Sequence, residues 1–189
     1  MKKIISICLC FVIVAIPITN VFAGFSLGIK TGYSTGSYGL SPNIYGIQLT
    51  KILNDGIALE IASEFIDSDM VLLSDFCLDW VIPKSHIKDN VIEIFLLKYM
   101  RNKPDDMYLG LGIGLHDLKI DNCDGTGVTG WRTLYDGTDI FLKIKIGYKK
   151  KIASKLFGFI ELKYTNYNKV VAKYTYLHLY GGINYNFHI

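Results

Sequence analysis

The sequence predicts an all-β fold: an eight-stranded antiparallel up-and-down transmembrane β-barrel. Three observations lead to this prediction. Apolar and polar residues alternate with a period of two in eight segments, each close to the ~9–11 residues that a tilted membrane strand needs. The connections between these segments alternate between short and long, as they do in outer-membrane barrels. Beyond residue 23 of the 189-residue chain, no stretch approaches the ~20 apolar residues of a transmembrane helix.

The amino terminus is expected to be a signal peptide that is cleaved between Ala23 and Gly24. Lys2 and Lys3 form its basic start, residues 4–16 are apolar apart from one serine, and Val21-Phe22-Ala23 supplies the small-residue cleavage pattern. The apolar run is too short to cross ~30 Å of hydrocarbon as a helix, which disfavours an uncleaved anchor. The expected organisation is a signal peptide, residues 1–23, and one barrel domain, residues 24–189.

In each strand, one parity is apolar and is predicted to face lipid, while the other is rich in glycine and charge and is predicted to face the interior. The pattern is clearest in residues 107–116, where leucine and isoleucine alternate with Gly110, Gly112 and Gly114. Both parities of residues 91–100 are largely apolar, and there Glu93 selects the inner face. The eight strands, in order, cover residues 25–33, 44–53, 57–65, 91–100, 107–116, 139–148, 156–164 and 176–187.

The short connections are residues 54–56, 101–106 and 149–155, and the long ones are residues 34–43, 66–90, 119–138 and 167–173. If the first strand starts on the periplasmic side, the long connections become external loops. The outward aromatic residues then fall into two rings, as the interfacial girdles of a membrane barrel require. The external ring contains Tyr33, Tyr45, Phe65 and Tyr164, and the periplasmic ring contains Phe25, Tyr148, Tyr185 and Phe187.

The predicted interior carries equal numbers of acids and bases. The inward acids are Glu60, Glu64, Glu93 and Glu161, and the inward bases are Lys30, Lys143, Lys145 and Lys163. An eight-stranded barrel is only just wide enough for its side chains to fill it, so these charges are expected to pair in a filled polar core. A proton or ion pathway is the less favoured interpretation. Two further lysines, Lys51 and Lys98, face outward near the periplasmic ends, where their ammonium groups reach water.

Composition excludes several other classes of function. The net charge of +3 falls to +1 once the signal peptide is removed, which leaves no footprint for nucleic acid. The cysteine spacings fit no zinc site, and we expect no metal and no cofactor. Cys77 and Cys123, the two cysteines of the mature chain, are expected to form a disulfide after export, with two free thiols as the alternative. The aspartates around the third long loop, residues 117–139, lack the spacing of a calcium loop and indicate a solvated loop.

Residues 91–119, with Leu97-Lys98-Tyr99, the Lys103-Pro104 turn and the glycine-alternating strand, resemble the small eight-stranded outer-membrane barrels of the OmpX, OmpW, opacity-protein and OmpA-transmembrane type. The last strand, Gly182 to Phe187, is similar to the carboxy-terminal assembly signal of these proteins, with two extra residues after it. The resemblance implies a Gram-negative outer-membrane location, lipid and lipopolysaccharide as surroundings, the barrel assembly machinery as a partner, and a monomer. It also implies a structural role, or an interaction role through the external loops.

Three alternatives to this function remain. Lipid A deacylases are eight-stranded barrels with a His-x-Ser-Asn motif on the seventh strand, where this chain has Lys163-Tyr164-Thr165-Asn166. Without the histidine no general base activates the hydroxyl, so an enzyme is disfavoured and no catalytic residue is assigned. The second alternative is an OmpW-type pore for apolar solutes, and the third is a soluble exported barrel with the apolar parity inside. The apolar loop at residues 70–83 is expected to pack on the barrel rim, or else to contact a partner or lipid.

Overall fold

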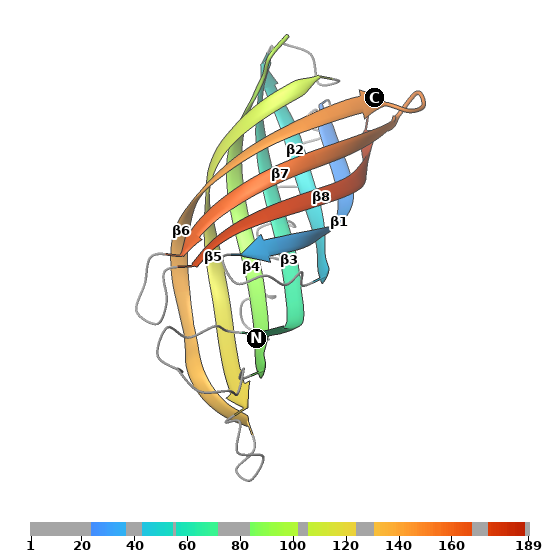
Figure 1. Ribbon diagram of the computed structural model, residues 1–189. Coiled ribbons are helices and arrows are strands. Elements are labelled where there is room, and N and C mark those ends of the chain that lie inside the picture. Colours follow the sequence, from blue (N-terminus) through green and yellow to red (C-terminus); the bar gives the residue numbers. More distant parts are fainter. Residues whose placement is uncertain are drawn as a thin grey trace.

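The structure is a computed structural model that describes residues 24–36, 43–54, 56–71, 84–101, 106–123, 131–167 and 174–187. These residues form one closed barrel in which every strand is antiparallel to its neighbours in chain order (Figure 1). The strands are β1 (Phe25–Gly36), β2 (Asn43–Asn54), β3 (Ile57–Val71), β4 (Lys84–Tyr99), β5 (Met107–Cys123), β6 (Trp131–Lys151), β7 (Leu156–Tyr167) and β8 (Tyr174–Phe187). The predicted fold is confirmed. No helix among these residues is long and apolar enough to cross a membrane.

The strand register fixes the tilt of the barrel. A walk from strand to strand along paired residues starts at Phe25 and returns to β1 at Thr35, so each full turn shifts the register by ten residues. A closed barrel with such a shift has strands that run ~35–45° from its axis. Neighbouring strands therefore cross the membrane at a slant, and residues at one membrane depth are not paired with each other directly.

The two faces of the barrel wall have opposite character. Outward side chains are apolar and exposed, as in Leu142 with 78% of its surface accessible, whereas the inward Glu161 and Lys163 are fully buried. A water-soluble barrel has the reverse arrangement, because apolar surface exposed to water is unfavourable. The outward apolar surface, with backbone hydrogen bonds closed around the ring, matches the requirements of a wall in contact with hydrocarbon.

Inward glycines make room for large interior side chains. At Gly112 on β5, a Cβ atom would collide with the Phe95 ring and the carbonyl oxygen of Ile94, both on β4. Gly181 on β8 faces outward instead, and a Cβ atom there would meet no heavy atom within 4 Å. Glycine is therefore required sterically at Gly112 and is dispensable at Gly181.

We expect Gly112→Ala to lower the free energy of unfolding by about 1–3 kcal/mol, since overpacking forces the backbone or Phe95 to move. The matched control, Gly181→Ala, should change it by less than about 0.5 kcal/mol, as is usual for surface substitutions. The measurement is the urea midpoint of the refolded barrel in detergent, followed by the folded band on unboiled gels. Equal midpoints for the two variants would contradict the close packing at Gly112.

Four strands, β3 to β6, extend six or more residues beyond their predicted bounds at one end, and the other four strands are longer by two or three residues. β3 and β4 pair as far as Val71 and Lys84, and β5 and β6 pair as far as Cys123 and Trp131. The predicted loops at residues 66–90 and 119–138 are therefore wrong in their bounds. At the other end, β6 also continues to Lys151, into the predicted turn. An alternation of apolar and polar residues indicates contact with lipid. Backbone hydrogen bonds between strands do not need this alternation and continue into water.

We call the prolonged ends of β3 to β6 the extension: residues 66–71, 84–90, 117–123 and 131–138. Figure 1 shows β5 and β6 reaching past the ends of β7 and β8 at the lower end of the barrel. β1, β2, β7 and β8 stop within a few residues of the external aromatic ring, at Gly36, Asn43, Tyr167 and Tyr174. One side of the barrel thus projects beyond the apolar belt and the other does not.

Candidate functional site

The eight interior charges predicted from the sequence all lie inside the barrel, and their side chains are almost completely buried. They come from five different strands and join in one network of ion pairs. The network contains Lys30, Glu60, Glu64, Glu93, Lys143, Lys145, Glu161 and Lys163. The arrangement places an equal number of positive and negative charges in a volume that side chains fill.

Glu93 on β4 is the centre of the external half of this network. Its carboxylate lies 2.7 Å from Lys143 Nζ, 3.0 Å from Lys163 Nζ and 3.2 Å from Lys30 Nζ. Lys163 and Lys30 also each contact Glu64, at 2.6 Å. Each of these two lysines therefore keeps Glu64 as a partner when Glu93 is lost, whereas Lys143 has Glu93 as its one carboxylate among the described ion pairs.

The periplasmic half is built on Lys145, whose ammonium group lies 2.5 Å from Glu60 and 2.8 Å from Glu161. Lys30 and Glu161, 3.8 Å apart, connect the two halves. Two tyrosine hydroxyls donate hydrogen bonds to the network, Tyr108 to Glu161 and Tyr180 to Glu64, both at 2.8 Å. Buried charges are tolerated where such additional hydrogen bonds satisfy their remaining lone pairs.

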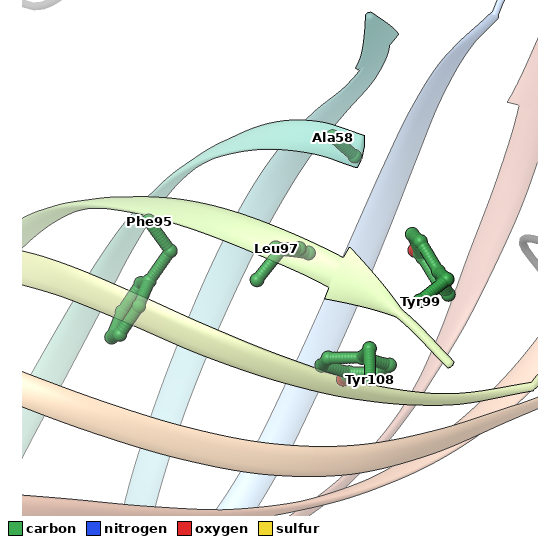
Figure 2. Close-up of a cluster of buried hydrophobic side chains, with 5 residues drawn as sticks. All are labelled: Ala58, Phe95, Leu97, Tyr99 and Tyr108. Carbon is green, nitrogen blue, oxygen red and sulfur yellow. The ribbon is translucent and has the colours of Figure 1, made fainter. Parts of the chain in front are cut away.

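Apolar side chains close the interior on both sides of the charges. Figure 2 shows the periplasmic cluster, in which side chains from β3, β4 and β5 project into the barrel: Ala58, Phe95, Leu97, Tyr99 and Tyr108. The external cluster consists of Ile44, Ile66, Val91 and Tyr180. Lys145 lies over the Phe95 ring, and Lys30 and Lys163 lie over the Tyr180 ring, at 4.5 to 4.8 Å from the ring centroids. The described side chains thus form a plug rather than the lining of a channel.

The prediction missed two further buried charges. Asp89 on β4 lies 2.6 Å from Nδ1 of His116 on β5, and both side chains are buried. Asp89 was assigned to a loop, although it shares the inward parity of Val91 and Glu93. Lys149 is also buried, over the Phe157 ring, in what was predicted to be a turn. His116 and His178 also face inward. Among the described residues, no three His, Cys, Asp or Glu side chains gather as metal ligands.

The outer face of the extension is polar and carries charges of both signs. Asp67, Lys88, Lys119 and Asp136 are cross-strand neighbours in one row over β3 to β6. Nε2 of His86 lies 3.2 Å from Asp67, and Lys119 Nζ lies 2.9 Å from Asp121. Asp117, Asp121 and Asp136 therefore lie on strands, which corrects the prediction of a solvated loop, whereas Asp139 lies on its predicted strand. Asp124 lies outside the described residues.

Hydrogen bonds keep two of these surface groups ionised. The Thr133 hydroxyl donates to Asp121 at 2.7 Å, and this bond, together with Lys119, holds the pKa of the Asp121 carboxyl below its ordinary value. The same contact with Asp121 raises the pKa of the Lys119 ammonium group. Both groups are charged at neutral pH, so the outer face of the extension carries charges of both signs.

The two residues that align with the histidine and the serine of the deacylase motif point into the barrel, away from lipid acyl chains. Lys163 and Thr165 are both fully buried inside the barrel, and Lys163 is bound to Glu64 and Glu93. An acyl chain in the membrane approaches the outward face, where Tyr164 lies. The predicted signal peptide, Cys77 and most of the apolar loop lie outside the described residues, and nothing is described of the Cys123 side chain beyond its strand. The disulfide and the cleavage site stay predictions.

No family model and no curated protein sequence matches the chain. The similarity is to solved structures of small outer-membrane barrels. The Neisserial surface protein A matches with a TM-score of 0.61 and 14% identity over 87% of this chain and 98% of that one. The outer membrane protein OprG from Pseudomonas aeruginosa matches with a TM-score of 0.64 and 14% identity over 89% and 98%. At such identities the likeness establishes the fold.

A third similar structure is Ail, the attachment invasion locus protein of Yersinia pestis, solved in complex with the heparin analogue sucrose octasulfate. Its TM-score is 0.54 and its identity 10%, over 86% of this chain and 96% of that chain. All three matches cover nearly the whole of the compared barrels. The fold of this chain is therefore that of the small outer-membrane barrels.

Proposed function

We propose that this chain is an outer-membrane barrel whose closed interior provides stability and whose extension and external loops bind a partner outside the cell. The proposal rests on two observations together: the interior is filled by side chains, and four strands continue far beyond the apolar belt. Bacterial lipid, lipopolysaccharide and the barrel assembly machinery are its proposed partners in the envelope, and a monomer its proposed state.

The extension has features of a presented surface. Its residues are held by backbone pairing on four neighbouring strands, which orders a surface before binding and so reduces the entropy cost of association. The outer face is polar and offers Asp67, Lys88, Lys119 and Asp136 in one row. A barrel that served only to fill the membrane would gain nothing from prolonging these strands.

The similar structures support this interpretation as analogies. The Ail complex contains a sulfated ligand, and the Neisserial protein is described as a surface protein. The described outer face here has more aspartates than lysines, so its complement is a partner with basic or mixed charge rather than a sulfated polymer. We expect no acyl hydrolase activity, because Thr165 is buried on the inner face.

A shortened barrel tests the proposal. Residues 67–88 are replaced by Asn-Gly between the paired Ile66 and Asp89, and residues 118–137 by Asn-Gly between the paired Asp117 and Thr138. Asn-Gly forms the two-residue hairpin turn that such paired ends accept. Bacteria that display the full chain should be retained on at least one of three immobilised protein probes (fibronectin, laminin and collagen) and not on heparin, and bacteria that display the shortened barrel should lose at least about 90% of that retention.

The control is the full chain with C77S and C123S, because the shortened barrel lacks both cysteines. Both proteins should show the compact unboiled gel band of a folded barrel. Retention of the shortened barrel at the level of the full chain, or failure of the full chain on all three protein probes, would contradict a role for the extension, and retention on heparin would contradict the charge complementarity argued for its outer face. Stable single-channel currents from the purified full chain would instead favour the pore and contradict the plugged interior.

A further inference from the structure

The periplasmic rim of the barrel is strongly basic. Among the described residues, those at or beyond the periplasmic aromatic ring include seven bases and a single acid, Asp106. The bases are Lys51, Lys98, Arg101, Lys149, Lys150, Lys151 and Lys155. The outer face of the extension, at the opposite end, has more aspartates than lysines. Among the described residues, positive charge thus gathers at the periplasmic end of the barrel and negative charge predominates on the outer face of the extension.

Three of these lysines point out of the barrel at the periplasmic border of the apolar belt. Lys51 on β2, Lys98 on β4 and Lys150 on β6 have the outward parity of their strands, and we call them the cationic collar. Each belongs to a strand that descends toward the periplasm, so each lies at an equivalent position on every second strand. Lys51 Nζ lies 5.0 Å from the centroid of the Phe25 ring, which places its charge beside the periplasmic aromatic ring.

Each collar lysine is followed two residues later by an exposed apolar side chain on the same outward face. These residues are Leu53, Met100 and Ile152, with 51%, 61% and 64% of their surface accessible. Apolar groups that flank a charge at the edge of a hydrocarbon-facing wall are typical of the interfacial region, where one part of the protein contacts acyl chains and another contacts headgroups. A hydrophilic periplasmic polymer such as peptidoglycan offers no acyl chains for these apolar residues to contact.

We propose that the cationic collar binds anionic phospholipid headgroups, such as phosphatidylglycerol, in the periplasmic leaflet. A basic segment near a membrane surface attracts anionic lipid, and each lysine contributes separately to that attraction. The three collar lysines lie on β2, β4 and β6, so anionic headgroups are expected to bind along one side of the barrel. This inference rests on the proposed membrane location and adds to it a lipid partner with a defined headgroup charge.

The test is the lipid selectivity of the reconstituted mature chain. The barrel is placed in phosphatidylcholine vesicles at low salt with a trace of spin-labelled phosphatidylglycerol or spin-labelled phosphatidylcholine, and the immobilised fraction of each label is measured. We expect the wild type to prefer the anionic label by about three- to fivefold, in line with the attraction of a few basic residues. The preference should disappear near 1 M salt, where the screening length is ~3 Å.

The variant K51Q/K98Q/K150Q should reduce this preference to less than about 1.5-fold, and the matched control K88Q/K119Q, at the other end, should retain it. Equal binding of the two labels by the wild type, or a preference kept by the collar variant, would overturn the inference. Sedimentation with peptidoglycan sacculi that depends on the collar, without any lipid preference, would also overturn it. A gel shift on boiling checks the barrel separately: if the shift is present, only the lipid inference fails, and if it is absent, the membrane assignment fails.

Discussion

Glu93→Gln is expected to lower the free energy of unfolding by about 3–5 kcal/mol, the cost of breaking a buried ion pair from one side. Glu93 lies within 3.2 Å of three lysine ammonium groups, and for Lys143 it is the one carboxylate that the described ion pairs provide. Glutamine keeps the size and removes the charge. Lys30 and Lys163 retain Glu64, so Lys143 becomes the uncompensated charge that unfolding relieves.

Urea unfolding in detergent, followed by the unboiled gel band, measures the loss. Asp67→Asn is the matched control, because Asp67 also contacts two basic groups, His86 and Lys88, but on the exposed outer face. An exposed pair contributes about 0–1 kcal/mol, so the control should stay near the wild type. A loss below 1 kcal/mol for Glu93→Gln would show that water reaches the network and that the interior is not a sealed plug.

A second variant separates the ion pair from the packing. Lys143→Met removes the partner and keeps an unbranched side chain of similar length. If Lys143 is the uncompensated charge, the double variant Glu93→Gln with Lys143→Met should be more stable than Glu93→Gln alone. The expected coupling free energy is about 0.5–3 kcal/mol, as for residues in contact. Additive losses would instead assign the cost to the hydrogen bonds of Glu93 with Lys30 and Lys163.

The sequence predicts which side of the wall each network residue faces, but not which residues meet. Glu93 selected the inner face of its strand because a carboxylate against lipid is costly, and this physical rule depends on one residue at a time. The contact between Glu93 and Lys163 joins β4 to β7 across the lumen. It depends on the ten-residue register shift around the ring, a property of all eight strands together that no single segment encodes.

The extension was missed for a related reason. Above the membrane the outward positions change from apolar to charged, as in Asp67 and Lys88. The alternation of apolar and polar residues therefore ends while the strands continue. Alternation still existed in the inward parity, where Ile87, Asp89 and Val91 are all buried. A criterion based on inward residues would have extended β4 and placed Asp89 beside His116. The bounds of strands in water follow from backbone pairing, which leaves a weak trace in the sequence.

Leu111→Arg tests the orientation of the whole wall and is expected to cost about 2–4 kcal/mol, the penalty for arginine on the lipid face at the midplane. Leu111 is outward, 59% exposed and close to the middle of the part of β5 that lies between the two aromatic rings. The measurement is urea unfolding of the barrel folded into phosphatidylcholine vesicles. In a soluble barrel with the same exposure, arginine would contact water and cost almost nothing, so the result separates the two environments.

Met107→Arg is the matched control on the same strand and face. Met107 is also exposed, at 42%, but lies at the periplasmic end of β5. There an arginine reaches the headgroups, and the expected cost is about 0–1 kcal/mol. A steep difference between the two positions requires hydrocarbon around the middle of the wall. Equal small costs at Leu111 and Met107 would mean that water surrounds the barrel, and the exposed apolar face would then need a different occupant.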